Sequence, residues 1–313
     1  MQRRRLGLTG LEVSCLTVGT VEQGMDYGIP VPGDFGRPEQ ADAVALLRMA
    51  ADSRVNLFDT APTYGKSEEL LGLALSGRQD CYFATKVRVP ESDSKPLTGP
   101  PLQRAVAESL RQSLRSLRRD VLDIVLIHNA TVEMIEQSDT TALLQVAQAR
   151  GDVRHLGASV YDEEAALAAV RSGGFDVIQV AYNLLDQRMA ERVFREARGC
   201  GVGVLARSPL LKGALSAKSQ WLPAELHPLR DAVARVRMEM GVSWDELPGA
   251  ALRFSLSNPN VDSVVFGPRT TAELQVALDA VRRGPLEQTQ LAVAAGLALH
   301  GAPMLNPSTW ALP

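Results

Sequence analysis

Cysteine is scarce in this chain, and its three copies form no recognisable framework. Cys15, Cys81 and Cys200 are odd in number, far apart and embedded in apolar segments. Their spacings match no zinc site, and an odd count leaves no complete set of disulfides. We therefore expect reduced thiols, as in a cytoplasmic protein, and no structural metal site.

Long apolar runs and a strong charge imbalance are also absent. A formal net charge of −3 over 313 residues argues against nucleic acid or an anionic membrane surface as the main partner. No uninterrupted apolar stretch reaches the roughly 18 residues of a membrane span. The basic start, Arg3-Arg4-Arg5, is not followed by an apolar run, so we predict no secretory signal. We expect a cytoplasmic protein that binds neither nucleic acid nor membrane.

What the chain does contain is an alternation of short β-rich runs with longer helical patterns. The runs are continuously apolar, as in parallel strands that are buried on both faces. Eight such strand–helix units favour an α/β fold of the (β/α)8 TIM barrel type, and we predict one domain over residues 1–313. The predicted strands are Cys15–Gly19, Val55–Phe58, Cys81–Lys86, Leu122–Ile127, Val153–Ala158, Asp176–Val180, Val202–Ala206 and Ser263–Phe266. The predicted helices are Glu39–Ala51, Ser67–Leu75, Pro101–Leu117, Thr131–Arg150, Asp162–Arg171, Gln187–Arg198, Ser243–Ser257 and Thr271–Val281.

Several stretches do not fit the eightfold rhythm. Arg5–Ser14 predicts a small β-hairpin that plugs the barrel floor. Leu210–Pro228 is a long insertion after the seventh strand, and Pro285–Pro313 adds an extra C-terminal helix, Leu291–Leu299, and a Pro-rich tail. With Gly24–Pro38, these segments are expected to shape the substrate pocket. The aromatic residues in these segments that could form pocket walls are Tyr27, Trp221 and Trp310. The alternative is that they serve only in packing.

Four polar residues stand at or beside the ends of three consecutive predicted strands. Asp59 and Lys86 close the second and third strands, and His128 follows the fourth. Tyr64 lies in the loop after the second strand. Because the carboxyl ends of barrel strands meet at one rim, where active sites of such barrels lie, we expect these four side chains to converge.

The four residue types together suit proton donation to a carbonyl oxygen. A tyrosine with an ordinary pKa of about 10 is a poor acid at neutral pH. An ammonium beside it would lower that pKa, Asp59 would hold Lys86 in place, and His128 would orient the carbonyl. No side chain supplies hydride, so a cofactor is required.

Each of the four also has a structural interpretation. Lys86 alone could be a salt-bridged lysine, and His128 a hydrogen-bonded core histidine. Asp59 could form an Asx-turn, and Tyr64 could be a half-buried turn residue. Their coincidence at successive rim positions favours the catalytic hypothesis.

The surrounding sequence resembles the aldo-keto reductase family. The segment Phe58–Glu68 is similar to the family signature DTA-x-x-YG-x-SE, and the opening Arg4–Ser14 is similar to that of bacterial members. The resemblance extends from Arg4 to Val281. The other matching segments, in the family's order, are Ala84–Val87, Leu126–His128, Gly157–Ser159, Gln179–Asn183, Ser208–Leu210 and Gly267–Arg269.

The resemblance implies a (β/α)8 barrel that binds a nicotinamide cofactor without a Rossmann fold, and no Gly-x-Gly-x-x-Gly follows a predicted strand here. It implies that Tyr64 is the general acid in reduction, supported by Lys86 and Asp59, and that His128 positions the carbonyl. Ser159 and Gln179 would hold the nicotinamide carboxamide. The implied cofactor-binding residues are Thr20, Ser159, Gln179, Arg207, Ser208, Leu210, Lys212, Gly267, Arg269 and Glu273.

Two of these positions depart from the family pattern. Arg207 stands where many relatives carry an aromatic residue that stacks on the nicotinamide, and its planar guanidinium could also lie against a ring. Ser208, Leu210 and Lys212 match the loop that crosses the pyrophosphate, with a solvated lysine as the alternative for Lys212.

The second departure concerns the adenine side. Glu273 stands where relatives carry a basic or amide side chain, and Val276-Ala277 replaces their Glu-Asn pair. Glu273 would repel a 2′-phosphate, whereas Arg269 could bind one. Arg269 favours NADPH, and NADH remains the alternative.

The resemblance implies a reductase of a small aldehyde or ketone, sugars included. The reverse reaction, oxidation of an aldose or alcohol with NAD⁺, would use the same residues. A nicotinamide-binding regulatory subunit, like the potassium-channel β-subunits, is a third hypothesis, which His128 disfavours because those subunits lack the histidine. A Schiff-base aldolase would need an uncharged Lys86, which Asp59 opposes. The sequence predicts no oligomeric state.

Overall fold

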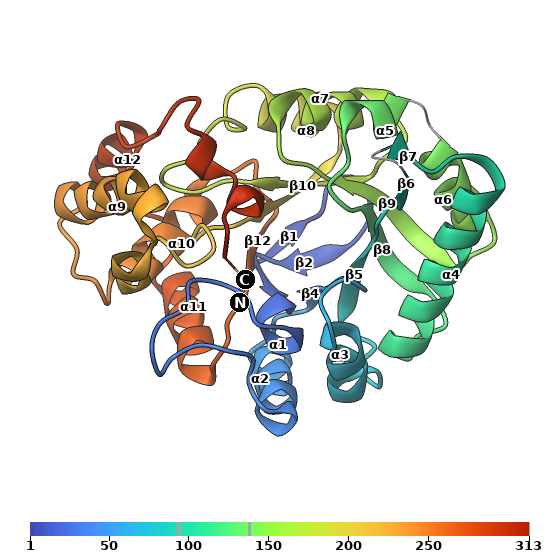
Figure 1. Cartoon of the computed structure of the whole chain (residues 1–313), viewed down its shortest axis with the longest axis horizontal. Helices are drawn as coiled ribbons and strands as arrows, with labels where there is room; N and C mark the ends of the chain where they lie inside the picture. The colour runs from blue at the N-terminus through green and yellow to red at the C-terminus, as the bar shows by residue number, and fades with distance from the viewer. Residues whose placement is uncertain (93–94, 137–138, 313) are drawn as a thin grey trace.

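The part of the chain that the structure describes, residues 1–92, 95–136 and 139–312, forms a closed barrel of eight parallel strands with helices around it (Figure 1). In this computed structural model the strands follow the order β3-β4-β5-β8-β9-β10-β11-β12, and β12 pairs with β3 to close the ring. The predicted (β/α)8 fold class is confirmed. The barrel strands are β3 Leu16–Gly19, β4 Leu57–Asp59, β5 Tyr82–Val87, β8 Leu122–Ile127, β9 Val153–Ser159, β10 Val177–Ala181, β11 Gly203–Arg207 and β12 Ser263–Phe266.

Burial on both faces explains the continuous apolar sequence of these strands. Every residue of β4, β8, β10 and β12 is buried, because one face of each strand points into the barrel and the other packs under the helices. The observed limits of the strands lie within one or two residues of the predicted ones, and β8 and β12 coincide with their predictions.

The N-terminal hairpin closes the floor of the barrel, as predicted. β1 Arg3–Arg5 and β2 Glu12–Ser14 pair antiparallel. Leu6 and Val13, from this hairpin, are fully buried in the same apolar cluster as strand residues such as Leu57. The plug therefore seals the end of the barrel that is opposite to the carboxyl ends of the strands.

Helices cover the outside of the barrel, and side-chain caps fix where some of them begin. Asp162 accepts a 2.7 Å hydrogen bond from the backbone N–H of Ala165 at the start of α7, which satisfies a free donor of the first turn. The α-helices are α1 Val21–Gly24, α2 Gln40–Asp52, α3 Ser67–Leu75, α4 Gly99–Leu117, α5 Val132–Glu136, α6 Asp139–Ala149, α7 Glu163–Ser172, α8 Val193–Cys200, α9 His227–Glu239, α10 Leu247–Ser257, α11 Thr271–Arg283 and α12 Gln288–Ala295. The 3-10 helices are η1 Ala217–Trp221, η2 Ala224–Leu226, η3 Pro303–Leu305 and η4 Pro307–Thr309.

Some elements differ from the sequence prediction. Helix α9 was not predicted, although Leu229, Val233 and Val236 form a buried stripe at helical spacing. The hairpin of β6 Glu91–Ser92 and β7 Lys95–Pro96 was not predicted either.

Several predicted helices also differ in their limits, and α10 begins four residues after the predicted Ser243. Helix α8 begins six residues after the predicted Gln187, and α12 begins three residues before the predicted Leu291. The described residues of the predicted helix Thr131–Arg150 form α5 and α6, and positions 137 and 138 lie outside the described residues.

The C-terminal tail returns to the barrel. In Figure 1 the red segment after α12 runs back to the centre of the view, and the carbonyl of Leu312 accepts a 3.0 Å hydrogen bond from the Nζ of Lys212. The tail therefore reaches the loop after β11, which lies at the carboxyl end of the barrel. Among the described helices, none is both long and apolar enough to cross a membrane.

Candidate active site at the rim of the barrel

Each strand of the barrel brings one of the predicted site residues to its carboxyl end. The residues are Thr20 after β3, Asp59 in β4, Lys86 in β5, His128 after β8, Ser159 in β9, Gln179 in β10, Arg207 in β11 and Gly267 after β12. Because the strands are parallel and closed into a ring, these positions surround one mouth.

Asp59 and Lys86 form a buried ion pair at the bottom of this mouth. The Nζ of Lys86 lies 2.8 Å from both carboxylate oxygens of Asp59 and 2.9 Å from the carbonyl oxygen of Thr60. Lys86 is 1% exposed and Asp59 is 5% exposed. These three contacts use all three N–H donors of the ammonium. Burial lowers the pKa of Lys86, and the neighbouring Asp59 carboxylate opposes this shift.

The hydrogen-bond chain continues from Asp59 to two more predicted residues. The amide nitrogen of Gln179 donates to Asp59 over 2.7 Å, and the Ser159 hydroxyl donates to the amide oxygen of Gln179 over 3.1 Å. All these side chains are buried. The structure thus brings Asp59, Lys86, Ser159 and Gln179 into one connected network.

Tyr64 lies directly above the ion pair. The ammonium of Lys86 lies 4.8 Å from the centre of the Tyr64 ring. The ring also meets His128 edge to face, with ring centres 5.7 Å apart and planes at 83°. The structure therefore brings the four predicted catalytic side chains together.

The predicted lowering of the pKa of Tyr64 by Lys86 is wrong for this structure. Burial raises the pKa of Tyr64 above its ordinary value, the negative charge of Asp59 raises it further, and Arg207 opposes the shift. The positive charge of Lys86 is balanced by Asp59 at contact distance. Its N–H donors are also spent on Asp59 and on the Thr60 carbonyl, so it leaves the phenol largely unaffected.

A close approach between two backbone segments fixes the loop that carries Tyr64. A Cβ atom at Gly24 would collide with the carbonyl oxygen of Tyr64 and with Ser67, and a Cβ at Gly65 would collide with the carbonyl oxygen of Gly24. The Ser67 hydroxyl donates a 2.6 Å hydrogen bond to the carbonyl of Thr20. The segment after β3 and the loop after β4 are therefore clamped together, and only glycine allows that spacing.

His128 is electrically neutral in this mouth. Burial lowers its pKa to about 3, and the positive charges of Lys86, Arg207 and Arg88 act in the same direction. The Nδ1 atom of His128 lies 3.5 Å from the Thr63 hydroxyl. A neutral imidazole carries one N–H, so His128 can donate one hydrogen bond while it remains uncharged and does not act as an acid.

Arg207 is half-buried at the mouth and stacks on an aromatic ring of the chain itself. Its guanidinium carbon lies 4.2 Å from the centre of the Tyr161 ring. It donates to the carbonyl of Val160 over 3.1 Å and to the Ser208 hydroxyl over 3.2 Å. Tyr161 is a site residue that was not predicted, although its place two positions after Ser159, just beyond the end of β9, is a signal for it.

The loop after β11 has an unusual backbone. Ser208, Leu211 and Lys212 have φ angles of 58°, 47° and 55°, in the left-handed region. The side-chain amide of Asn183 supports the loop by donating 3.1 Å to the carbonyl of Ser208. Leu210 is half-buried there.

Lys212 itself is partly enclosed. Its ammonium lies 4.8 Å from the centre of the Tyr27 ring and is bonded to Leu312 in the C-terminal tail, and burial lowers its pKa. In the described structure this predicted phosphate contact faces the tail.

The loop after β12 is tied to other loops by charged groups. Arg269 forms an ion pair with Asp34, and its backbone N–H donates 2.6 Å to Glu273. Glu273 also pairs with Lys218 at 3.1 Å. Asp34 and Lys218 were not predicted as site residues, because nothing in a single sequence shows that three distant loops meet.

The three aromatic candidates for pocket walls have different surroundings. Tyr27 lies under Lys212, and its pKa is raised by burial and by the neighbouring Tyr64 and Tyr161. Trp221 is 52% exposed, whereas Trp310 is 7% exposed and donates 3.1 Å to the Met304 carbonyl. Of these three aromatic residues, Tyr27 is the one for which the described structure shows a predicted catalytic residue, Tyr64, as a neighbour.

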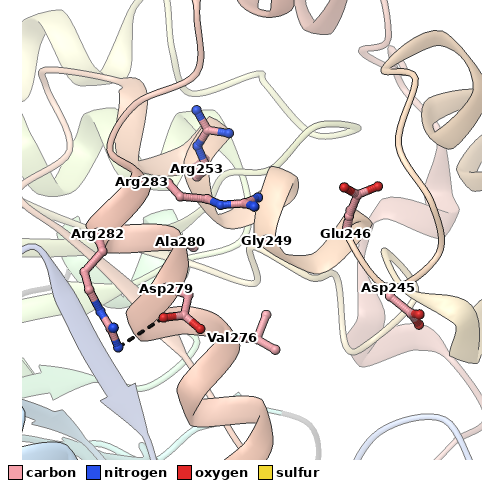
Figure 2. Close-up of a pocket in the computed structure, with 9 residues that line it drawn as sticks. All are labelled: Asp245, Glu246, Gly249, Arg253, Val276, Asp279, Ala280, Arg282 and Arg283. Atoms are coloured by element: carbon pink, nitrogen blue, oxygen red, sulfur yellow. Dashed lines mark ion pairs between the residues drawn. The ribbon is translucent and has the colours of Figure 1, made fainter.

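A separate depression lies on the outer surface between α10 and α11 (Figure 2). None of the predicted rim residues lines it. Its walls carry both signs of charge, and Arg282 pairs with Asp279 at 3.1 Å within it. The lining residues are Asp245, Glu246, Gly249, Arg253, Val276, Asp279, Ala280, Arg282 and Arg283.

Comparison with known proteins gives a consistent family match. The sequence pattern of the aldo/keto reductase family matches residues 16–297. An L-galactose dehydrogenase of Arabidopsis thaliana is 30% identical over 299 residues, which cover 90% of this chain and 88% of that protein. A probable voltage-gated potassium channel subunit beta of the same plant is 27% identical over 322 residues, covering 91% of this chain and 93% of that one. Among solved structures, an aldo-keto reductase from Bacillus halodurans in its holo form has a TM-score of 0.78 at 25% identity and covers 96% of this chain and 97% of its own.

Proposed function

The chain belongs to the aldo/keto reductase family of oxidoreductases, and from this premise we propose that it reduces the carbonyl group of a small aldehyde or ketone with a reduced nicotinamide dinucleotide. One observation carries the proposal: the phenol of Tyr64, the buried Asp59–Lys86 pair and a neutral His128 meet at one rim of the barrel. A bound nicotinamide would supply the hydride that no side chain can provide.

The polar groups at the bottom of the mouth fit a nicotinamide carboxamide. The hydroxyl of Ser159 donates to Gln179, so its oxygen keeps its acceptor capacity, and the amide oxygen of Gln179 keeps a second lone pair. Both could accept from a carboxamide NH2 group. Asp59 fixes Gln179 by accepting from its amide nitrogen, so the acceptors are already oriented before anything binds.

Tyr64 is the proposed proton donor. Its raised pKa keeps the phenol protonated throughout the physiological range, which is the form that a reduction needs. Addition of hydride to a carbonyl turns its oxygen into an alkoxide, which is a stronger base than a phenolate. The proton transfer is therefore downhill once the oxygen has gained charge.

His128 and the ion pair have supporting roles in this proposal. Neutral His128 donates a hydrogen bond to the carbonyl oxygen and orients it toward Tyr64. Lys86 and Asp59 form a rigid polar floor under the phenol and hold Gln179 in place.

Reduction is favoured over the reverse oxidation by two features of the mouth. Oxidation needs a phenolate as base, and burial together with Asp59 disfavours that form. Arg207, which makes no ion pair among the described residues, would also disfavour the positive charge of an oxidised nicotinamide nearby. The relative named L-galactose dehydrogenase keeps oxidation of an aldose as the second candidate.

A purely regulatory role is less well supported. One relative is named as a channel subunit, but this chain has a full set of proton-transfer side chains in mutual contact, His128 included. A regulatory nicotinamide-binding protein would not need that set.

Turnover of a carbonyl panel tests the proposal. Consumption of NADH and of NADPH is followed by absorbance with aldehydes, ketones and aldoses. Tyr64→Phe is expected to lower kcat by roughly 10²–10⁴-fold with the dinucleotide Kd unchanged. Tyr82→Phe is the matched control, because Tyr82 begins β5 and so lies at the end of that strand opposite to Lys86 and the mouth. Equal turnover by Tyr64→Phe and the wild type would remove Tyr64 from the mechanism.

A further inference from the structure

Three carboxylates gather where the loops after β3, β11 and β12 meet. Glu273 contacts Lys218 from the loop after β11, and Asp34, from the loop after β3, pairs with Arg269. The third, Glu22, lies beside Gly267, with its Oε1 atom 3.8 Å from the position that a Cβ would take on that glycine. Two of these loops were predicted from the sequence to bind the phosphates and the adenosine of a dinucleotide.

The two cations of this cluster are already engaged. The guanidinium of Arg269 pairs with Asp34, and the ammonium of Lys218 pairs with Glu273 at 3.1 Å. Glu273 is also held by the backbone N–H of Arg269 over 2.6 Å. Neither cation can turn to a new phosphate without leaving a carboxylate unpaired.

Glu22 is the excess acid of the cluster. It makes no ion pair among the residues that the structure describes. Burial raises its pKa to about 8, and the negative charge of Glu273 adds to the shift, while Lys218 and Arg269 oppose it. The region therefore already resists the negative charge of its own third acid.

We propose that Asp34 and Glu273, by engaging Arg269 and Lys218, make this site selective for NAD(H) over NADP(H). The inference rests on the proposed nicotinamide-dependent function and specifies its cofactor. A 2′-phosphate would bring roughly 1.5 to 2 further negative charges into a region whose two cations are already neutralised by Asp34 and Glu273. The 2′-hydroxyl of NAD(H) is instead a hydrogen-bond donor, which a carboxylate can accept.

Arg269 supports a bound 2′-phosphate less in the structure than it does in the sequence. A free arginine after Gly267 favours a bound phosphate, but here the guanidinium pairs with Asp34. Asp34 belongs to the Gly- and Pro-rich segment after β3, far from Arg269 in sequence. The sequence alone therefore shows the positive charge of Arg269 but does not show that Asp34 neutralises it.

Binding titrations test the selectivity directly. The Kd values of NADH and NADPH are measured by nicotinamide fluorescence for the wild type and for Asp34→Asn, Glu273→Gln and Glu22→Gln. We expect the wild type to bind NADH at least about tenfold tighter than NADPH, which corresponds to roughly 1.4 kcal/mol. Asp34→Asn frees Arg269 and should lower this ratio by severalfold, and Glu273→Gln, which frees Lys218, should lower it as well. Glu22→Gln replaces an acid that is largely protonated at pH 7 and should leave the ratio near the wild-type value.

Matched charge changes on the outer surface provide the control. Glu246→Gln and Asp279→Asn each remove one negative charge from the depression between α10 and α11 (Figure 2), and the NADH/NADPH ratio should stay at the wild-type value. An equal shift in these controls would overturn the local assignment.

Two further outcomes separate this inference from the proposed function. If the wild type binds NADPH as tightly as NADH and reduces carbonyls, the selectivity is wrong and the proposed function stands. If neither dinucleotide binds, the proposed function fails and the selectivity fails with it.

Discussion

The ammonium of Lys86 lies over the face of the Tyr64 ring, 4.8 Å from its centre, while its hydrogen bonds go to Asp59 and to the carbonyl of Thr60. Lys86 is therefore a neighbour of the phenol without being a free charge beside it. The pKa of Tyr64 rises through burial and through Asp59. This arrangement holds the proton on Tyr64 until a reacting oxygen becomes basic enough to take it.

Removing one partner of the buried ion pair should destabilise the protein strongly. Asp59→Asn leaves Lys86 charged and unpaired in the core, and Lys86→Met leaves Asp59 in the same state, so each should lower the free energy of unfolding by about 3–5 kcal/mol. Urea denaturation measures it. The double variant should lose less than the sum of the single losses, because no unpaired charge remains. The exposed pair Arg171–Glu196 is the control, and strictly additive losses at positions 59 and 86 would contradict the coupling.

The rate of reduction should not titrate with Tyr64 below pH 9 or so. The pKa of Tyr64 is raised above its ordinary value of about 10, so the phenol stays protonated. Ionisation of Tyr64 should therefore cause no change in kcat/KM for reduction from about pH 5 to 9. Oxidation of the product alcohol needs the phenolate and should become faster as the pH rises. A fall in reduction with an apparent pKa near 7, absent in Tyr64→Phe, would show that Lys86 does acidify the phenol.

His128 should affect acid stability as well as turnover. Its pKa is about 3 in the folded protein against about 6.5 in an unfolded chain, so the unfolded state takes up the proton first. Stability is therefore lost as the pH falls from about 6.5 toward 3. His128→Gln should lose less stability than the wild type between pH 7 and 4, measured by urea denaturation. It should also lower kcat/KM by about 10²–10³-fold through loss of the carbonyl-orienting donor. Parallel stability curves for both proteins would mean that the fold does not lower the pKa of His128 below that of the unfolded chain.

Gly24→Ala should impair turnover without altering any side chain of the site. The added methyl group would collide with the carbonyl oxygen of Tyr64 and the backbone of Ser67, and a displacement of about 1 Å can lower a rate roughly 100-fold. The measurement is kcat at saturating carbonyl, with the circular dichroism spectrum showing that the fold persists. Gly77→Ala is the control, since a Cβ there meets nothing within 4 Å. Wild-type kcat in Gly24→Ala would show that the clamp does not position Tyr64.

Much of the fold could be predicted from the sequence because parallel barrel strands have a strong local signature. Runs such as Leu122–Ile127 are apolar throughout, and only burial on both faces explains that. Helix α9 was missed because it follows an irregular insertion with two short 3-10 turns, so its stripe of buried residues lacked a neighbouring strand to mark it.

Site residues at strand ends could likewise be predicted from the sequence, whereas some site residues in loops could not. Residues at strand ends, such as Asp59 and Lys86, could be placed by counting strands, although their catalytic roles remain predictions. Asp34 and Lys218 could not, because their positions depend on loops whose shape has no local signal. The left-handed backbone after β11, carried by residues other than glycine, is an example: tertiary contacts impose it against the local preference.

The closure of β12 onto β3, where Val264 aligns with Leu16 and Phe266 with Val18, has a kinetic consequence. The rim groups come from every strand in the ring, so no contiguous fragment of the chain carries the whole set. During refolding, catalysis should return only with the final, long-range pairing of the first and last barrel strands, later than most helix formation. The return of enzyme activity during refolding would then show when the ring of eight strands has closed.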